Sequence, residues 1–267
     1  MWSPGTVDLP AATIRLVQLG PAGAPALVVV PDPPNVLEHH RRLLESLAQR
    51  WRIVAFELPG FGRSRLRGPL SFARVSAAVV ALLDHLELRD VTLEMACIGA
   101  HVGLRVAHAR PDRIARLVLI QTATAAQLRT WARGTDLAGL LHTPIVGQAL
   151  CSLAARVMVR HWYGAALPPG TDRITRAAYT APALAGLAHG GRFPLAAAYQ
   201  ALARLPDPPG IEQPTHLVFG TGDRTHAGTA PDLLPHTTLE RLPTCGHFPN
   251  LEAPAQHAAR LDALLAL

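Results

Sequence analysis

The chain has 267 residues, of which 49% are hydrophobic and 16% are charged. This composition excludes an intrinsically disordered protein, which combines low hydrophobicity with high net charge. The length suffices for one α/β domain that carries an inserted lid. The formal net charge is +6, and the lysine and arginine positions are all arginine. Because these arginines are scattered and lack interleaved aromatic residues, we expect a solvated arginine surface and no nucleic-acid partner.

No apolar run approaches the roughly 20 residues that a membrane span requires. The first residues, Met1 to Gly5, carry neither the basic stretch nor the apolar core of an export signal. The three cysteines, Cys97, Cys151 and Cys245, are too few for a disulfide framework. We therefore expect a soluble cytoplasmic protein with no membrane partner. The sequence indicates no particular oligomeric state.

Predicted strands and helices alternate along the chain, which favours a mostly parallel sheet covered by helices on both faces. The predicted strands are residues 13–19, with the alternation of an edge strand, and residues 26–30, 52–58, 91–96, 116–120, 215–219 and 238–242. The predicted helices of this unit are residues 37–50, 71–86, 98–109 and 251–267.

Between residues 124 and 208 the sequence changes to Ala/Leu-rich helical segments interrupted by Pro and Gly. The pattern there predicts no strand of the main sheet. We therefore predict a helical lid over residues 124–208, inserted into a core formed by residues 1–123 and 209–267.

Cys97 lies between a predicted strand and a predicted helix, where a nucleophile would project from a tight turn with a helix N-terminus behind it. Side chains packed against such a turn must be small. The sequence supplies Gly99 and Ala100 but places Met95 where glycine is usual. Taken alone, Cys97 fits a small buried hydrophobic residue better than a nucleophile.

Two later loops carry an acid and a histidine. Asp223 follows a predicted strand in a Gly-Thr-Gly turn, and His247 follows Gly246 in the loop before the last helix. An aspartate can hold an imidazole in the tautomer that a nucleophile needs, although Asp223 alone is equally typical of a turn or a helix cap. Nucleophile, acid and histidine in this chain order, each after a strand, is the order found in α/β hydrolases.

The segment from Phe56 to Ser64, FELPGFGRS, resembles the Asp-x-Pro-Gly-x-Gly-x-Ser turn of this superfamily, with Glu57 in place of the aspartate. Together with the Cys97 elbow and the Asp223 and His247 loops, it makes the chain similar to α/β hydrolases from about residue 13 onward. The resemblance implies an α/β-hydrolase fold, a mostly parallel central sheet flanked by helices. Function must still be argued from the site.

Two departures from the family pattern bear on the chemistry. Cys97 replaces the usual serine. In this feature the chain resembles dienelactone hydrolases and some thioesterase-like and natural-product biosynthetic members of the superfamily. The loop after the second predicted strand reads Pro31-Asp-Pro-Pro-Asn35, where the family usually supplies an oxyanion-hole N–H. Pro33 and Pro34 have no N–H, so the expected oxyanion donors are the N–H of Ile98 and, if the register shifts, that of Asn35.

Several other side chains have open roles. Asp32 resembles the loop carboxylate that contacts the cysteine in dienelactone hydrolases, but the sequence favours a turn aspartate before Pro33. Glu94, an acid in the central strand, requires a partner, for which an arginine or His101 is expected. Four lid aromatic residues could line a substrate pocket or form the core of the lid: Trp131, Trp162, Tyr163 and Tyr199.

No metal site and no cofactor are predicted, because the histidines considered lack a carboxylate at metal-ligand spacing: His39, His40, His85, His101 and His189.

The first functional hypothesis is a Cys97–His247–Asp223 triad that acts on an ester-like or thioester-like apolar small molecule, in secondary metabolism. The alternative is a lyase or cyclase with His247 as the base, similar to the superfamily members that eliminate acetate from acetylated tetronates. A third possibility is an inactive relative that binds a ligand. The retention of both Asp223 and His247 speaks against this third reading.

Overall fold

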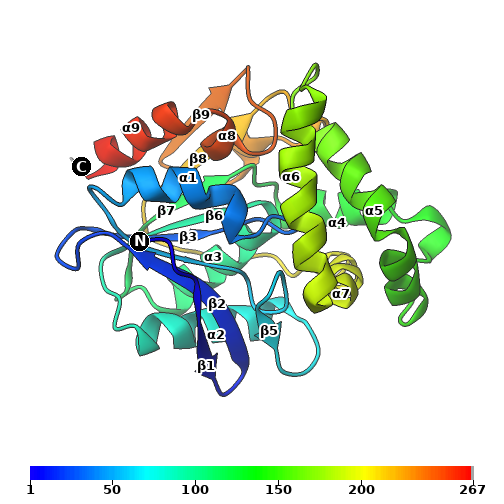
Figure 1. Cartoon of the computed structure of the whole chain (residues 1–267), viewed down its shortest axis with the longest axis horizontal. Helices are drawn as coiled ribbons and strands as arrows, with labels where there is room; N and C mark the ends of the chain where they lie inside the picture. Colours follow the sequence, from blue (N-terminus) through cyan, green and yellow to red (C-terminus); the bar gives the residue numbers. More distant parts are fainter. Residues whose placement is uncertain (266–267) are drawn as a thin grey trace.

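The computed structural model describes the chain from residue 1 to residue 265, leaving aside the side chains of residues 137, 190–192 and 194. Its centre is a nine-stranded sheet in the order β1-β2-β4-β3-β6-β7-β8-β9, with β5 paired to β2 (Figure 1). The pairs from β4 through β9 are parallel, and β2 pairs antiparallel with β1, β4 and β5. The strands are β1 Gly5–Leu9, β2 Ala12–Leu19, β3 Ala26–Val30, β4 Arg52–Phe56, β5 Arg65–Leu66, β6 Val91–Ala96, β7 Ile114–Ile120, β8 Thr215–Gly220 and β9 Thr238–Leu242.

Helices cover both faces of this sheet, and the alternation of β3 separates the two core layers. Val28 and Val30 pack in the layer formed with α2 and α3, while Leu27 and Val29 pack in the layer formed with α1 and α9. Every residue of β6, at the centre, is buried, as expected for a parallel strand covered on two sides. The helices of this unit are α1 Leu37–Leu47, α2 Phe72–His85, α3 Cys97–Ala109, α8 Pro249–Glu252 and α9 Pro254–Leu264.

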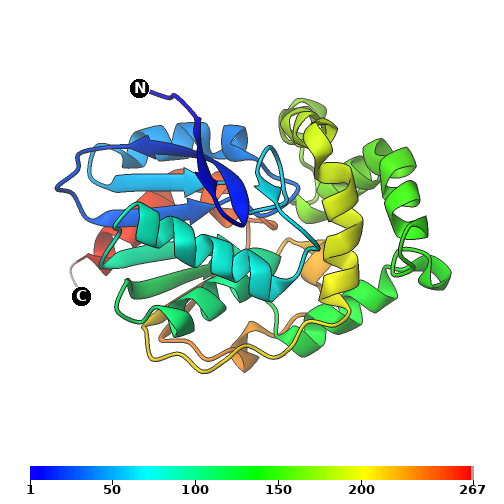
Figure 2. The same ribbon diagram turned by 90° about the horizontal axis from the view of Figure 1, so that it is seen from below.

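The segment predicted as a lid is helical and lies at one end of the sheet (Figure 2). No strand of the sheet comes from residues 124–208 of the described chain. Tyr163, Val159 and Leu187 form part of a separate hydrophobic cluster, here called the lid cluster, which also includes Phe248 from outside this segment. No helix in the described residues is long and apolar enough to span a membrane. The main helices of the lid are α4 Ala125–Gly134, α5 Val146–Ala166, α6 Arg173–Gly186 and α7 Arg192–Leu202.

Two details of the sequence prediction were wrong. The predicted edge strand is β2, which lies inside the sheet because β1 pairs along its outer side. Its polar residue Arg15 is buried in ion pairs with Glu38 and Glu57, so the alternation did not mark a solvent edge. The predicted closing helix is divided into α8 and α9 at Ala253, where the following Pro254 interrupts the helix.

Candidate active site

Cys97 occupies the turn between β6 and α3, and its backbone is left-handed, with φ of 47°. A non-glycine residue in this region is strained, which is typical of a nucleophile held on a strand-to-helix turn. Met95 fits beneath the turn because α3 offers glycine there. A Cβ on Gly103 would lie 3.2 Å from Met95 Sδ, and one on Gly99 would lie 3.9 Å from Met95 Cβ.

His247 and Asp223 form a buried pair. His247 Nδ1 lies 2.7 Å from Asp223 Oδ2, to which it donates. Asp223 also accepts hydrogen bonds from Gln121 Nε2 at 2.9 Å and from the backbone N–H of Thr225 at 2.8 Å. Burial alone would raise the pKa of Asp223, but the charge and hydrogen bond of His247 lower this pKa to about 2. Asp223 is therefore an ionised acceptor that orients the imidazole.

Asp32 lies at the other nitrogen of the same imidazole. Its Oδ2 is 3.2 Å from His247 Nε2, and the nearby backbone N–H of Ile98 slightly lowers the pKa of this carboxyl. Its Oδ1 is buried and has no hydrogen-bond partner among the described residues. Burial raises the pKa of Asp32, and the hydrogen bond and charge of His247 act in the opposite direction.

With a carboxylate oxygen at each nitrogen, His247 is held as an imidazolium. Burial would lower its pKa, but the charge of Asp223 and the hydrogen bonds with Asp223 and Asp32 raise the pKa of His247 well above its usual value. Two negative charges around one cation favour the charged form even in a buried site.

The Cys97 thiol faces two histidines. Its Sγ, a nitrogen of His247 and a nitrogen of His226 all lie within 4.8 Å of one another, and the contact between Sγ and His226 Nε2 is 3.7 Å. Burial and the charge of Asp32 raise the pKa of the Cys97 thiol to about 11, although the nearby His247 acts in the opposite direction. The resting site therefore contains a neutral thiol beside an ionic Asp32–His247–Asp223 arrangement.

Sequence reasoning missed His226. It follows the Asp223 turn by three residues, and the short helix after Asp223, residues 224–226, directs it toward Cys97. Burial and the charge of His247 lower the pKa of His226 to about 3, so this imidazole is neutral. The polar Thr-His pair after the acid turn was the only available signal, and nothing in its spacing relates it to residue 97.

The loop after β3, which was expected to complete an oxyanion hole, supplies no free backbone N–H from residues 33 to 35. Pro33 and Pro34 lack an N–H, and the N–H of Asn35 donates to the carbonyl of Asp32 at 2.7 Å. The expectation that Asn35 could supply a second oxyanion donor was therefore wrong, because a turn already uses this N–H. The remaining expected donor is the N–H of Ile98, which lies near the Asp32 carboxylate.

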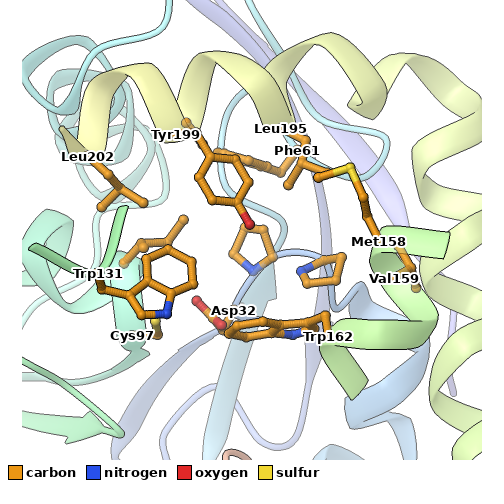
Figure 3. A pocket seen from close by; sticks show the side chains of 14 residues that line it. Asp32, Phe61, Cys97, Trp131, Met158, Val159, Trp162, Leu195, Tyr199 and Leu202 are labelled. Carbon is orange, nitrogen blue, oxygen red and sulfur yellow. The ribbon is translucent and has the colours of Figure 1, made fainter. Parts of the chain in front are cut away.

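A largely apolar pocket opens above Cys97 and Asp32 (Figure 3). The Asp32 carboxylate lies near the rings of Trp131 and Trp162, and the hydroxyl of Tyr199 points toward the same space. Tyr163, which was expected among the pocket residues, is instead fully buried in the lid cluster and donates its hydroxyl to Asn35 Oδ1 at 2.6 Å. The other lining residues are Pro33, Pro34, Phe61, Ile98, Met158, Val159, Leu195, Ala198 and Leu202.

Glu94 lies on the opposite side of β6 and takes no part in this site. It accepts hydrogen bonds from His257 Nε2 at 2.8 Å and from Asn250 Nδ2 at 2.9 Å. The expected arginine or His101 partner was therefore wrong. His101 Nε2 instead contacts the carbonyl of Ala123 at 2.9 Å. The hydrogen bonds of Glu94 with Asn250 and His257 join β6 to α8 and α9.

Comparison with known proteins agrees with this architecture. A haloalkane dehalogenase from Mycolicibacterium paratuberculosis is 36% identical over 104 residues, 38% of this chain and 35% of that protein. The dihydrolipoyllysine-residue acetyltransferase component of an acetoin cleaving system from Pseudomonas putida is 35% identical over 128 residues, 45% of this chain and 33% of that protein. The chain thus matches about a third of the length of these relatives.

Among solved structures, an esterase from Thermogutta terrifontis superposes with a TM-score of 0.73 at 18% identity, over 99% of this chain and 98% of the other. That likeness shows the fold alone. The family model described as the alpha/beta hydrolase family matches residues 21–260. The chain belongs to the alpha/beta hydrolase family.

Proposed function

We propose that this enzyme acts on an apolar, ester-like small molecule by proton transfer, and that it eliminates a carboxylate from the substrate without forming an acyl-Cys97 intermediate. The apolar pocket supports the substrate class. Haloalkanes, named for one matched relative, are also small apolar molecules. A role in secondary metabolism belongs to the same proposal.

The choice of elimination over acyl transfer rests on the position of Asp32. Acyl transfer develops negative charge on the former carbonyl oxygen, which requires N–H donors aimed at that oxygen. Here the Ile98 N–H lies near the Asp32 carboxylate, and the Asn35 N–H is used in a turn. A second negative oxygen beside Asp32 would be repelled, so the site suits a reaction with no tetrahedral oxyanion.

Elimination requires a base, and the Asp32–His247 pair supplies one. Asp32 Oδ1 has no protein partner and Asp32 lines the pocket, so this oxygen can receive a proton from a substrate C–H. The C–H electron pair then forms the new double bond, and the C–O bond breaks with its electrons on the departing carboxylate. His247 keeps its charge between Asp32 and Asp223 and stabilises the negative charge that moves through the site.

Acyl transfer by Cys97 is the second candidate, and one observation favours it. Cys97 has the left-handed backbone of a nucleophile elbow, and its sulfur is within 4.8 Å of a nitrogen of His247. In that mechanism His247 would accept the thiol proton, Cys97 would attack the carbonyl carbon, and Asp223 would orient the imidazole.

An isotope experiment separates the two reactions. The probe is an acetate ester that carries an acidic C–H on the carbon next to the acetoxy-bearing carbon, incubated with the enzyme in H₂¹⁸O. Elimination breaks the alkyl C–O bond, so we expect an alkene and acetate without ¹⁸O from water. Acetate with one ¹⁸O atom and an alcohol product would show acyl cleavage and overturn the proposal.

A further inference from the structure

Cys97, which lines the pocket, forms a buried cluster with His226 and His247. One ligand atom from each lies within 4.8 Å of the other two. Around a tetrahedral Zn²⁺, sulfur and nitrogen ligands at about 2.3 and 2.0 Å from the metal are separated by roughly 3.6 Å. The distance of 3.7 Å from Cys97 Sγ to His226 Nε2 matches this separation.

Asp32 lies beside this cluster but outside it, because its oxygens are not within 4.8 Å of all three ligand atoms. Its Oδ2 lies 3.2 Å from His247 Nε2. One thiolate and two imidazoles are a donor set suited to Zn²⁺ and similar transition metals, and poorly suited to Mg²⁺ or Ca²⁺.

In both imidazoles the nitrogen that faces away from the cluster contacts a protein side chain, as is usual for metal-bound histidines. His247 Nδ1 is held by Asp223 at 2.7 Å, and His226 Nδ1 contacts Thr229 Oγ1 at 3.0 Å. In each ring the Nε2 atom is thereby left for the cluster. The three residues come from the β6–α3 turn, the segment after β8 and the loop before α8, which explains why no metal-ligand spacing is visible in the sequence.

We infer that Cys97, His226 and His247 form a site for a thiophilic divalent metal such as Zn²⁺, and that its occupation inhibits the enzyme. Binding would replace the Cys97 thiol proton and one His247 proton by the metal. It would also take His247 Nε2 away from Asp32, so the Asp32–His247 pair that supplies the base would be lost. The inhibition rests on the proposed function, whereas the metal binding does not.

His226 makes the site testable separately from catalysis, because the proposed elimination uses Asp32, His247 and Asp223 but not His226. In a Co²⁺ titration of the full chain, we expect one Co²⁺ per chain with a sulfur-to-cobalt charge-transfer band. Cys97→Ser should remove the band, and His226→Gln should weaken binding at least tenfold. Cys151→Ala, which removes another buried thiol, should change neither.

Binding should also strengthen as the pH rises, because the metal displaces protons from the ligands. Absence of a sulfur-to-cobalt band in the wild type would overturn the site, and so would a band that survives Cys97→Ser or an affinity unchanged by His226→Gln. Circular dichroism and thermal unfolding of each variant establish that it is folded before titration.

A second measurement addresses inhibition, with the acetate-ester probe and Zn²⁺. We expect Zn²⁺ to inhibit the wild type, and His226→Gln to keep its rate without Zn²⁺ while needing at least tenfold more Zn²⁺ for half inhibition. Equal inhibition of both proteins would overturn the regulatory claim. If the wild type shows the cobalt band but does not turn over the probe, the function proposed above fails and the metal site stands.

Discussion

Asp32 Oδ2 and His247 Nε2 lie 3.2 Å apart, on the nitrogen where the histidine of a hydrolytic triad would receive a proton from its nucleophile. The Asp223 carboxylate occupies the other nitrogen at 2.7 Å. His247 is therefore bracketed by two acids, and Cys97 stands beside this arrangement with a thiol whose pKa is raised to about 11. This geometry favours acid–base chemistry centred on Asp32 and His247.

Asp223→Asn should lower kcat by roughly 10²- to 10⁴-fold, because an amide cannot stabilise the imidazolium as a carboxylate does. Since the substitution is nearly isosteric, the circular dichroism spectrum should remain that of the wild type. Steady-state kinetics on the acetate-ester probe checks this. A variant that retains more than half of kcat would show that Asp223 does not support the reacting group.

Asp32→Asn should lower kcat at least as much as Asp223→Asn, because it removes the oxygen proposed to receive the substrate proton. The same kinetic assay measures it, with Glu94→Gln as a buried-acid control away from the pocket. If Asp32→Asn keeps near-wild-type kcat while Asp223→Asn does not, the base is His247 alone and the role of Asp32 is structural.

Asp32→Asn should also lower the pKa of the Cys97 thiol, since the Asp32 charge is the second cause of its elevation after burial. The pH dependence of Cys97 alkylation by iodoacetamide, followed by mass spectrometry of the Cys97 peptide, reports this pKa. We expect the wild-type midpoint near pH 11 and a lower midpoint in the variant. A wild-type midpoint below pH 8 would indicate a thiolate and would instead support nucleophilic catalysis.

The protein should lose stability as the pH falls below about 6.5, the usual pKa of histidine. Burial lowers the pKa of His40 and of His226 to about 3, and that of His101 to about 4. For groups with a lowered folded pKa, the stabilisation is present above the unfolded pKa and is lost as the pH falls toward the folded value. The unfolded chain then binds up to three more protons, which gives a slope of roughly 4 kcal/mol per pH unit.

Urea unfolding between pH 4 and pH 7.5 measures this slope. His40→Leu removes one of the three groups and should reduce the slope by about 1.4 kcal/mol per pH unit. A free energy of unfolding that stays constant from pH 7 to pH 5 would contradict the prediction.

Much of the fold could be predicted because its signals are local. β3, β6 and β9 have the predicted bounds, since each is a compact run of strand-forming residues between clear interruptions. The helical segment between residues 124 and 208 was visible as a change of composition. β1 was missed because Gly5–Leu9 is short and mostly exposed, so its pairing with β2 leaves no hydrophobic pattern in the sequence.

The site was only partly predictable. The family-like chain order predicted that His247 and Asp223 lie together. It did not predict the second carboxylate at His247 or the position of His226 beside Cys97. These contacts join loops more than a hundred residues apart. They arise from tertiary packing, which no local sequence pattern marks. Tyr163 could not be placed from the sequence either, because an aromatic side chain suits both a pocket wall and a lid core. In the structure its hydroxyl donates a hydrogen bond to Asn35.

The most direct test of the central claim is the effect of Cys97→Ala on turnover of the acetate-ester probe, measured beside His247→Ala and with intact-mass analysis of the wild type during turnover. The account predicts that Cys97→Ala keeps a substantial fraction of kcat, that His247→Ala loses nearly all of it, and that the wild type carries no acetyl adduct. Equal and near-complete losses in both variants, together with an acetyl-Cys97 adduct in the wild type, would contradict it.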